Sequence, residues 1–98
     1  MKNIVLNGRL TADPEIRTVG ENGVKVAGFC IANNDSDKEK GEFYDVQCWD
    51  RLAEFSENYL KKGAAVLVQG TFNNEKYQDK EGKNRTHFRV TAARIEFN

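Results

Sequence analysis

Apolar and polar residues alternate along most of this chain, which is the pattern of β-strands. In residues 2–10 the alternation puts Ile4, Leu6 and Leu10 on one side, which we expect to face the core. Pro14 follows, and because proline has no backbone N–H it is expected to break or bend the chain there. The sequence therefore predicts that the chain begins with a β-strand that ends before Pro14.

Two more strands are predicted before the middle of the chain, at residues 15–19 and 23–33. The sequence ENG between them is typical of a hairpin turn. On the second of these strands, Ala27, Phe29 and Ile31 are expected to point inward. A polar, charged stretch without periodicity follows and is read as a loop.

The next predicted strand, FYDVQCW at residues 43–49, has an unusual outward face. Its inward face comprises Tyr44, Val46 and Cys48, and its outward face Phe43, Asp45, Gln47 and Trp49. The outward face is thus polar in the middle and aromatic at both ends. Exposed aromatic side chains are suited to stacking on nucleobases, because every base has a π-face. Two alternatives stay open: Trp49 packs under the helix that follows, or Phe43 packs against a neighbouring subunit.

A single helix is predicted after this strand. The residues at helical spacing are Leu52, Phe55, Tyr59 and Leu60. Asp50 is expected to cap the N-terminus of the helix, and Gly63 is expected to end it after two lysines.

The C-terminal part is predicted to form a long hairpin arm. Residues 64–72 read as an apolar strand, after which the chain becomes polar and turns near Glu81-Gly82 into a last strand. This order favours an all-β fold, a five-stranded Greek-key barrel of the oligonucleotide/oligosaccharide-binding type with a short helix between strands 3 and 4. A different α+β sheet stays open. Residues 1–98 are expected to form a single domain.

Composition is that of an ordinary soluble domain, with 31% charged and 39% hydrophobic residues. The sequence has no apolar run of about 18 residues and no signal-peptide pattern, so the cytoplasm is the default compartment. Alternation puts Cys30 and Cys48 on opposite faces, which predicts two reduced thiols. Together with His87 they are too few for a zinc site.

The net charge is zero, which argues against a simple basic nucleic-acid binder. The charges are unevenly distributed, however. Residues 1–34 carry four basic and three acidic groups (+1), residues 35–60 three and eight (−5), and residues 61–98 eight and four (+4). A local positive groove formed by the C-terminal third is therefore compatible with overall neutrality.

The C-terminal arm supplies further candidates for binding. Tyr77 stands in the charged run EKYQDK beside Lys76, where nothing nearby offers its ring a core. On the last strand Arg85, His87 and Arg89 share the face opposite Phe88 and Val90. A groove lined by these residues and the outward aromatics would combine base stacking with phosphate attraction.

Simpler readings of the same residues stay open. Tyr77 would then be an incidental loop aromatic and His87 a surface residue. The pair of arginines on the last strand would form a solvated face balanced by Glu75 or Asp79. Catalysis finds little support, since no glycine-rich phosphate loop and no nucleophile motif occur. We predict no catalytic residue, no metal ligand and no cofactor.

The chain as a whole resembles the bacterial and phage single-stranded DNA-binding proteins. The segments that carry the resemblance are IVLNGRLTADPEIR, GVKVAGFCIAN, FYDVQCWDRLAEF, ENYLKKGAAVLVQG and KYQDKEGKNR. The resemblance implies an oligonucleotide-binding barrel, usually a homotetramer, that wraps single-stranded DNA without strong sequence preference. It also implies a function in DNA replication, recombination and repair at the nucleoid, with no catalysis and no membrane association.

The resemblance extends to single residues. Phe43, Trp49 and Tyr77 are similar to the family's base-stacking aromatics, and Arg17, Lys62 and Arg85 to basic positions near the DNA path. Two features depart from the family. Asp37 stands near the place of a further stacking tryptophan. The chain stops at Asn98, without the acidic-tipped tail that recruits replication and repair partners, so recruitment through a tail is not expected here.

Two other classes of function stay open. A dimeric primosomal protein on the same barrel would act mainly as a protein-interaction module, and the oligomer mass in solution separates a dimer from a tetramer. A small nuclease on a similar barrel would cleave DNA in the presence of a divalent metal.

Overall fold

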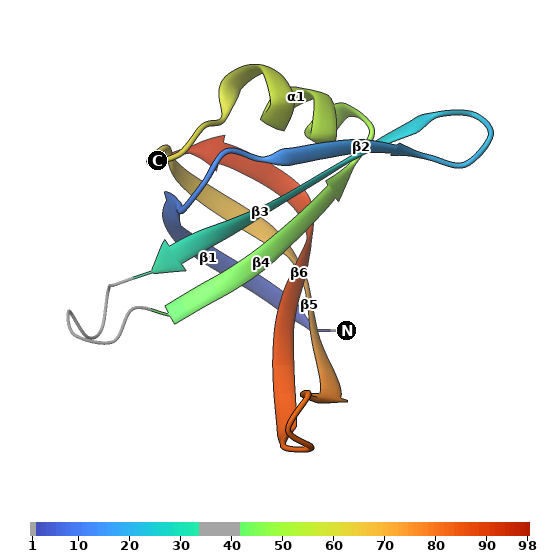
Figure 1. The fold of residues 1–98 in the computed structure, drawn as a ribbon. Helices are drawn as coiled ribbons and strands as arrows, with labels where there is room; N and C mark the ends of the chain where they lie inside the picture. Colours follow the sequence, from blue (N-terminus) through green and yellow to red (C-terminus); the bar gives the residue numbers. More distant parts are fainter. Residues whose placement is uncertain (1, 34–41) are drawn as a thin grey trace.

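The structure is a computed structural model. It describes residues 2–33 and 42–98, apart from the side chains of residues 75, 86 and 87. In chain order the elements are β1 (Asn3–Leu10), β2 (Glu15–Val19), β3 (Val24–Asn33), β4 (Glu42–Trp49), α1 (Arg51–Tyr59), β5 (Ala65–Gln78) and β6 (Asn84–Phe97). The strands wind into a barrel, with α1 across one end and the hairpin of β5 and β6 projecting from the other (Figure 1).

Pairing of the first and third strands closes the barrel. The sheet order is β1-β5-β6-β4-β3-β2, and an additional β1–β3 pairing joins Arg9 and Leu10 to Ala32 and Ile31. In the described part of the chain β2 pairs only with β3, so it extends the sheet outside the ring. Five strands remain in the ring, and α1 lies between the third and fourth of them. The predicted fold class is confirmed.

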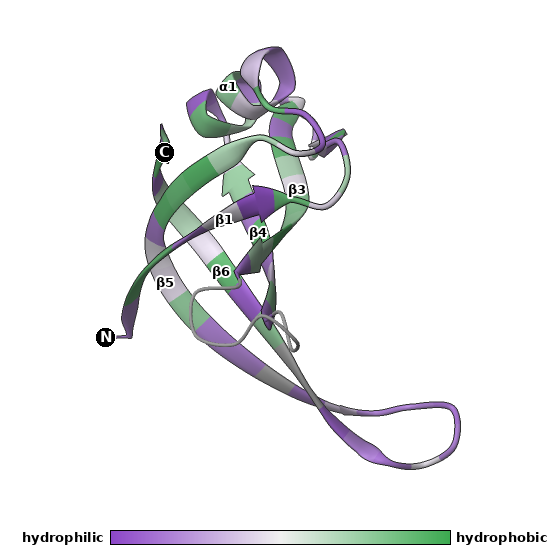
Figure 2. Ribbon diagram, turned by 90° about the vertical axis from the view of Figure 1, so that its left-hand side faces the viewer, coloured by the Kyte–Doolittle hydropathy of each residue, from purple (hydrophilic) through white to green (hydrophobic). Residues whose placement is uncertain are grey.

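The core consists mainly of residues that alternation predicts to point inward. The buried residues include Leu6, Leu10, Ala27, Phe29, Ile31, Val46, Cys48, Val66, Val68, Val90 and Ile95. Ile4 and Tyr44 are only partly buried at the edge of this core. In Figure 2 the hydrophobic colour gathers on the barrel strands, whereas the projecting arm is largely hydrophilic. The arm therefore extends beyond the part of the sheet that the core stabilises.

Both cysteines are free, as predicted. Cys48 is buried inside the barrel, whereas Cys30 pairs in register with Asp45 on the outer side. Burial raises the pKa of both thiols above the ordinary value, so each is expected to stay protonated near neutral pH.

The helix begins where predicted, but the expected N-cap is wrong. Asp50 makes no side-chain capping bond, and its backbone has φ 56° and ψ −117°. A capping side chain needs extended backbone at that residue to reach the free N–H groups of the first turn. Here the Asp50 N–H instead donates to the carbonyl of Lys25 at 2.9 Å, which ties the start of the helix to β3.

The predicted end of the helix at Gly63 is also wrong. The helix ends at Tyr59, because Leu60 adopts an extended conformation and places its side chain in the core, 5% exposed. Gly63, at φ 89°, forms the turn that follows. The face that α1 buries carries Ala53 and Ser56, while Tyr59 is 63% exposed.

Candidate nucleic-acid interface

One outer surface carries most of the residues that the sequence singles out. Neighbours in register share a face of a sheet, and Asp45 of β4 lies beside Arg89 of β6. Further along the arm, Arg85 of β6 lies opposite Tyr77 of β5. On the other side of β4, Trp49 lies beside Val26 of β3. We call this surface, from β2 across β3 and β4 to β6 and the outward side of the arm, the outer face.

Phe43 and Trp49 stand at the two ends of β4 on the outer face. Their exposed fractions are 62% and 43%, so neither side chain belongs to the core. The six-residue separation places them about 20 Å apart along the strand. Trp49 borders a depression with Leu52 at the start of α1, but it is not buried beneath the helix. The strand thus presents two separate aromatic surfaces.

A depression of about 510 Å³ lies between the aromatic ends. It brings together Arg17 of β2 and Arg89 of β6, two basic residues far apart in sequence. Acidic side chains also line it, Glu15 and Asp45 among them. The depression is therefore of mixed charge, and it does not form the strongly positive groove of a typical basic binder.

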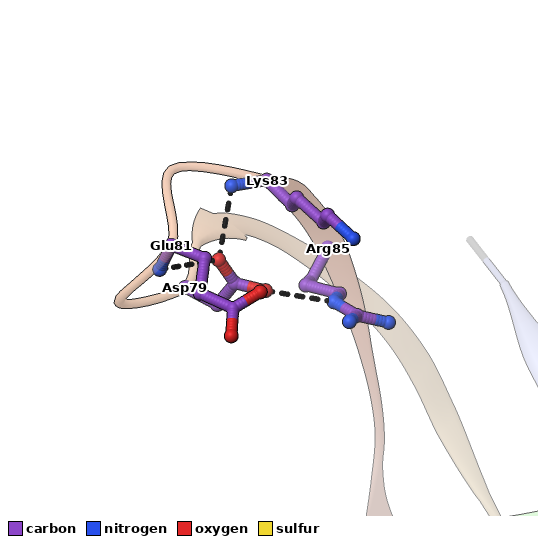
Figure 3. Close-up of polar contacts among 4 residues, drawn as sticks. All are labelled: Asp79, Glu81, Lys83 and Arg85. Carbon is purple, nitrogen blue, oxygen red and sulfur yellow. Dashed lines mark hydrogen bonds and ion pairs between the residues drawn. The ribbon is translucent and has the colours of Figure 1, made fainter.

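The arm carries a second group of candidate residues. Lys76, Tyr77 and Arg85 line a depression of about 600 Å³ near the tip, and the Tyr77 ring is 49% exposed. Arg85 is not only a solvated cation, because its Nε–H donates to Asp79 Oδ2 at 3.0 Å (Figure 3). Asp79 is one of the two acidic partners left open by the sequence; the side chain of the other, Glu75, lies outside the described part of the chain.

The carboxylate of Asp79 also organises the turn at the tip of the arm. Its Oδ1 atom accepts hydrogen bonds from the backbone N–H groups of Glu81 and Lys83, both at 2.9 Å. The Lys83 N–H, followed by the Arg85 guanidinium, holds the pKa of Asp79 below its ordinary value. Asp79 is therefore ionised at neutral pH.

Lys62 lies near the edge of the outer face. Its backbone N–H donates to Asp13 Oδ1 at 2.8 Å, and Asp13 lines the depression that holds Arg17. The backbone of His87 pairs with Glu75 on the arm, but its side chain is outside the description. Asp37, near the expected place of another stacking aromatic, also lies outside the described residues.

The sequence did not single out a row of aromatic rings at the base of the arm. Phe72 and Phe88 stack with centroids 5.5 Å apart and planes at 12°, and Tyr44 meets Phe72 edge-on at 6.4 Å. Phe43 and these three rings line one depression of about 380 Å³, and Phe88 is 43% exposed. The sequence feature that could have indicated these residues is the length of the predicted arm, because a long arm places Phe88 beyond the part of the barrel that the core covers.

None of the helical residues that the structure describes forms a segment with the length and apolar character that spanning a membrane requires.

Known proteins resemble this chain over nearly its full length. The single-stranded DNA-binding protein of Neisseria meningitidis serogroup A is 34% identical over 99 residues, which cover 94% of this chain and 56% of that protein. The single-stranded DNA-binding protein of Halalkalibacterium halodurans is 35% identical over 102 residues, covering 99% of this chain and 60% of that protein. The chain thus spans little more than half the length of these relatives.

A solved structure shows the same likeness in three dimensions. The crystal structure of a deletion mutant of the single-stranded DNA binding protein from Thermus aquaticus superimposes with a TM-score of 0.79 and 32% identity. The match covers 100% of this chain and 41% of that one. In addition, the sequence pattern of the single-strand binding protein family matches residues 1–98. The chain therefore belongs to the single-strand binding protein family.

Proposed function

We propose that this chain binds single-stranded DNA without sequence preference and without catalysis, in DNA replication, recombination and repair. The observation that carries the proposal is the outer face, where the exposed rings of Phe43 and Trp49 flank a depression containing Arg17 and Arg89. Bases would stack on the rings while phosphates contact the arginines. The names of the related proteins support the same function.

Tyr77 is the third proposed stacking residue. Its exposed ring lies opposite Arg85 on the arm, so a base and its phosphate could be bound together there. Each stacked base contributes about 1–3 kcal/mol. Three aromatic side chains would therefore provide several kcal/mol before any phosphate contact is counted. Lys62, Lys76 and His87 are proposed as further phosphate contacts.

Stacking is expected to dominate the affinity, because the outer face mixes acidic and basic side chains. If Arg17, Arg85 and Arg89 alone each neutralise one phosphate, log K should fall with log[salt] with a slope of about −2 per subunit, and if all six proposed contacts do so, the slope should be about −4. The measurement is binding of labelled oligo-dT over a range of NaCl concentrations. Duplex DNA of the same length is the control, because its bases are not available for stacking.

Two results would count against this division of the binding energy. A much steeper slope would mean that phosphate contacts dominate. Equal affinity for the duplex would mean that stacking contributes nothing.

We further propose that the chain works as a homo-oligomer, with a tetramer expected. The support is the cluster of Tyr44, Phe72 and Phe88 at the base of the arm, whose rings this chain alone leaves partly uncovered. Aromatic side chains that remain exposed beside one another are typical of contact surfaces between proteins. The expected result of light scattering in solution is a mass of four chains of 11.1 kDa.

A mass of two chains would instead favour the protein-interaction module of primosomal type, in which DNA binding is secondary. A single-chain mass at micromolar concentration would contradict both forms of self-association.

A further inference from the structure

The turn at the tip of the arm is built around one acidic side chain. The Asp79 N–H donates to the Lys83 carbonyl, and the Gly82 N–H donates to the Asp79 carbonyl, both at 3.0 Å. One carboxylate oxygen, Oδ1, accepts the backbone N–H groups of Glu81 and Lys83. The turn therefore needs the backbone of Asp79 and only one of its two carboxylate oxygens.

The second oxygen has a different partner. Oδ2 accepts a hydrogen bond from Nε–H of Arg85, which lies six residues further along the chain on β6. The Asp79 side chain is 24% exposed and that of Arg85 is 57% exposed. The contact holds the guanidinium by one edge while most of it stays in solvent.

In this geometry, the N–H donors of Arg85 that are best suited to binding a phosphate remain available. A guanidinium has five N–H donors, and only the one on Nε is used here. Within the described part of the chain, its two terminal nitrogens have no partner, and Figure 3 shows them directed away from the carboxylate. Terminal nitrogens of arginine bind phosphate oxygens in a bidentate manner.

The hydrogen bond between Asp79 and Arg85 matters for binding because of where Arg85 lies relative to Tyr77. Arg85 and Tyr77 are direct neighbours across the hairpin and line the same depression. A negative charge beside bound DNA is unfavourable by itself, because it repels the phosphates. The hydrogen bonds of Oδ1 to the turn explain why an acidic residue is present, so any role of Asp79 in DNA binding depends on the contact of Oδ2 with Arg85.

We propose that Asp79 is a positioning residue, which fixes the Arg85 guanidinium beside Tyr77 so that one nucleotide is bound through its base and its phosphate together. This inference rests on the proposed function. Without the carboxylate, the long side chain of Arg85 would sample many rotamers. Its conformational entropy would then be lost when DNA binds, which weakens the affinity.

The test compares Asp79→Asn with a charge control on the same turn. Asparagine keeps an oxygen for the backbone N–H groups, but its amide nitrogen cannot accept from Arg85. We expect Asp79→Asn to weaken oligo-dT binding by about three- to tenfold, as expected for losing part of one charge-assisted hydrogen bond. Glu81→Gln removes the same charge without touching Arg85, so its affinity should stay equal or rise slightly.

A double variant identifies the route of the effect. In an Arg85→Gln background, Asp79→Asn should cause no additional loss of affinity. If Asp79→Asn weakened binding in this background as much as it does in the otherwise unsubstituted protein, the substitution would act through the turn alone. That result would overturn the inference. Asp79→Ser, whose hydroxyl can also accept hydrogen bonds from the turn, is a second variant if Asp79→Asn unfolds.

Unchanged or tighter binding by Asp79→Asn would also overturn the inference, because the carboxylate would then only compete with phosphate. Failure of the unsubstituted protein to bind oligo-dT would refute the proposed function itself. The two failures are therefore distinguishable in one set of titrations.

Discussion

Replacing Trp49 with alanine should weaken binding to oligo-dT by about 1–3 kcal/mol, roughly 5- to 150-fold. The reason is the position of the ring, which is 43% exposed at one end of β4 on the outer face. Removal of the ring takes away one stacking surface and leaves the arginines in place. The measurement is fluorescence anisotropy of a labelled oligonucleotide titrated with each protein.

The matched control is Tyr59→Ala. Tyr59 is an aromatic residue of similar size that is 63% exposed, but it lies on α1 and packs on Phe55, away from the outer face. It should change the affinity by less than about twofold, because the ring removed lies off the proposed path of the bases. If both variants weaken binding equally, the effect is not specific to the outer face.

Replacing Gly70 with alanine should destabilise the protein by about 1–3 kcal/mol or more. A Cβ atom at this position would overlap the carbonyl oxygen of Thr91, in the backbone of the paired strand. The clash falls at the register irregularity between β5 and β6, and neither strand can shift without disturbing the barrel. Urea denaturation followed by circular dichroism measures the free energy of unfolding.

Gly28→Ala is the control for this prediction. A Cβ atom there meets nothing closer than the carbonyl oxygen of Val46 at 3.9 Å, an ordinary contact. The substitution also restricts the unfolded chain, so it should be neutral or stabilising by up to about 1 kcal/mol. Equal stability of the two variants would contradict the packing shown for Gly70.

The outward aromatics could be predicted from sequence because they depend on a local property. A strand alternates faces with a period of two residues wherever it lies, so Phe43 and Trp49 had to share a face. The turn near Glu81-Gly82 was also predicted from local sequence, whereas the register that places Tyr77 opposite Arg85 was not specified until the structure showed it.

Other features could not be predicted because they depend on distant parts of the chain. The parallel pairing that places Asp45 beside Arg89 joins β4 and β6, which are separated in the chain by α1 and the long strand β5. The prediction of Asp50 as the helix N-cap was wrong, because its backbone N–H donates a hydrogen bond to Lys25 on β3 and its backbone conformation is not that of a capping residue. Local propensity carries no information on such contacts.

Binding of a base on the outer face is tested most directly by the fluorescence of Trp49, the only tryptophan in the sequence. The measurement is a titration of the unsubstituted protein with oligo-dT, exciting the indole selectively. Stacking of a base on the ring should quench the emission progressively until the site is saturated. Unchanged emission at saturating DNA, with binding confirmed independently by anisotropy, would contradict stacking at Trp49 and with it the proposed use of the outer face.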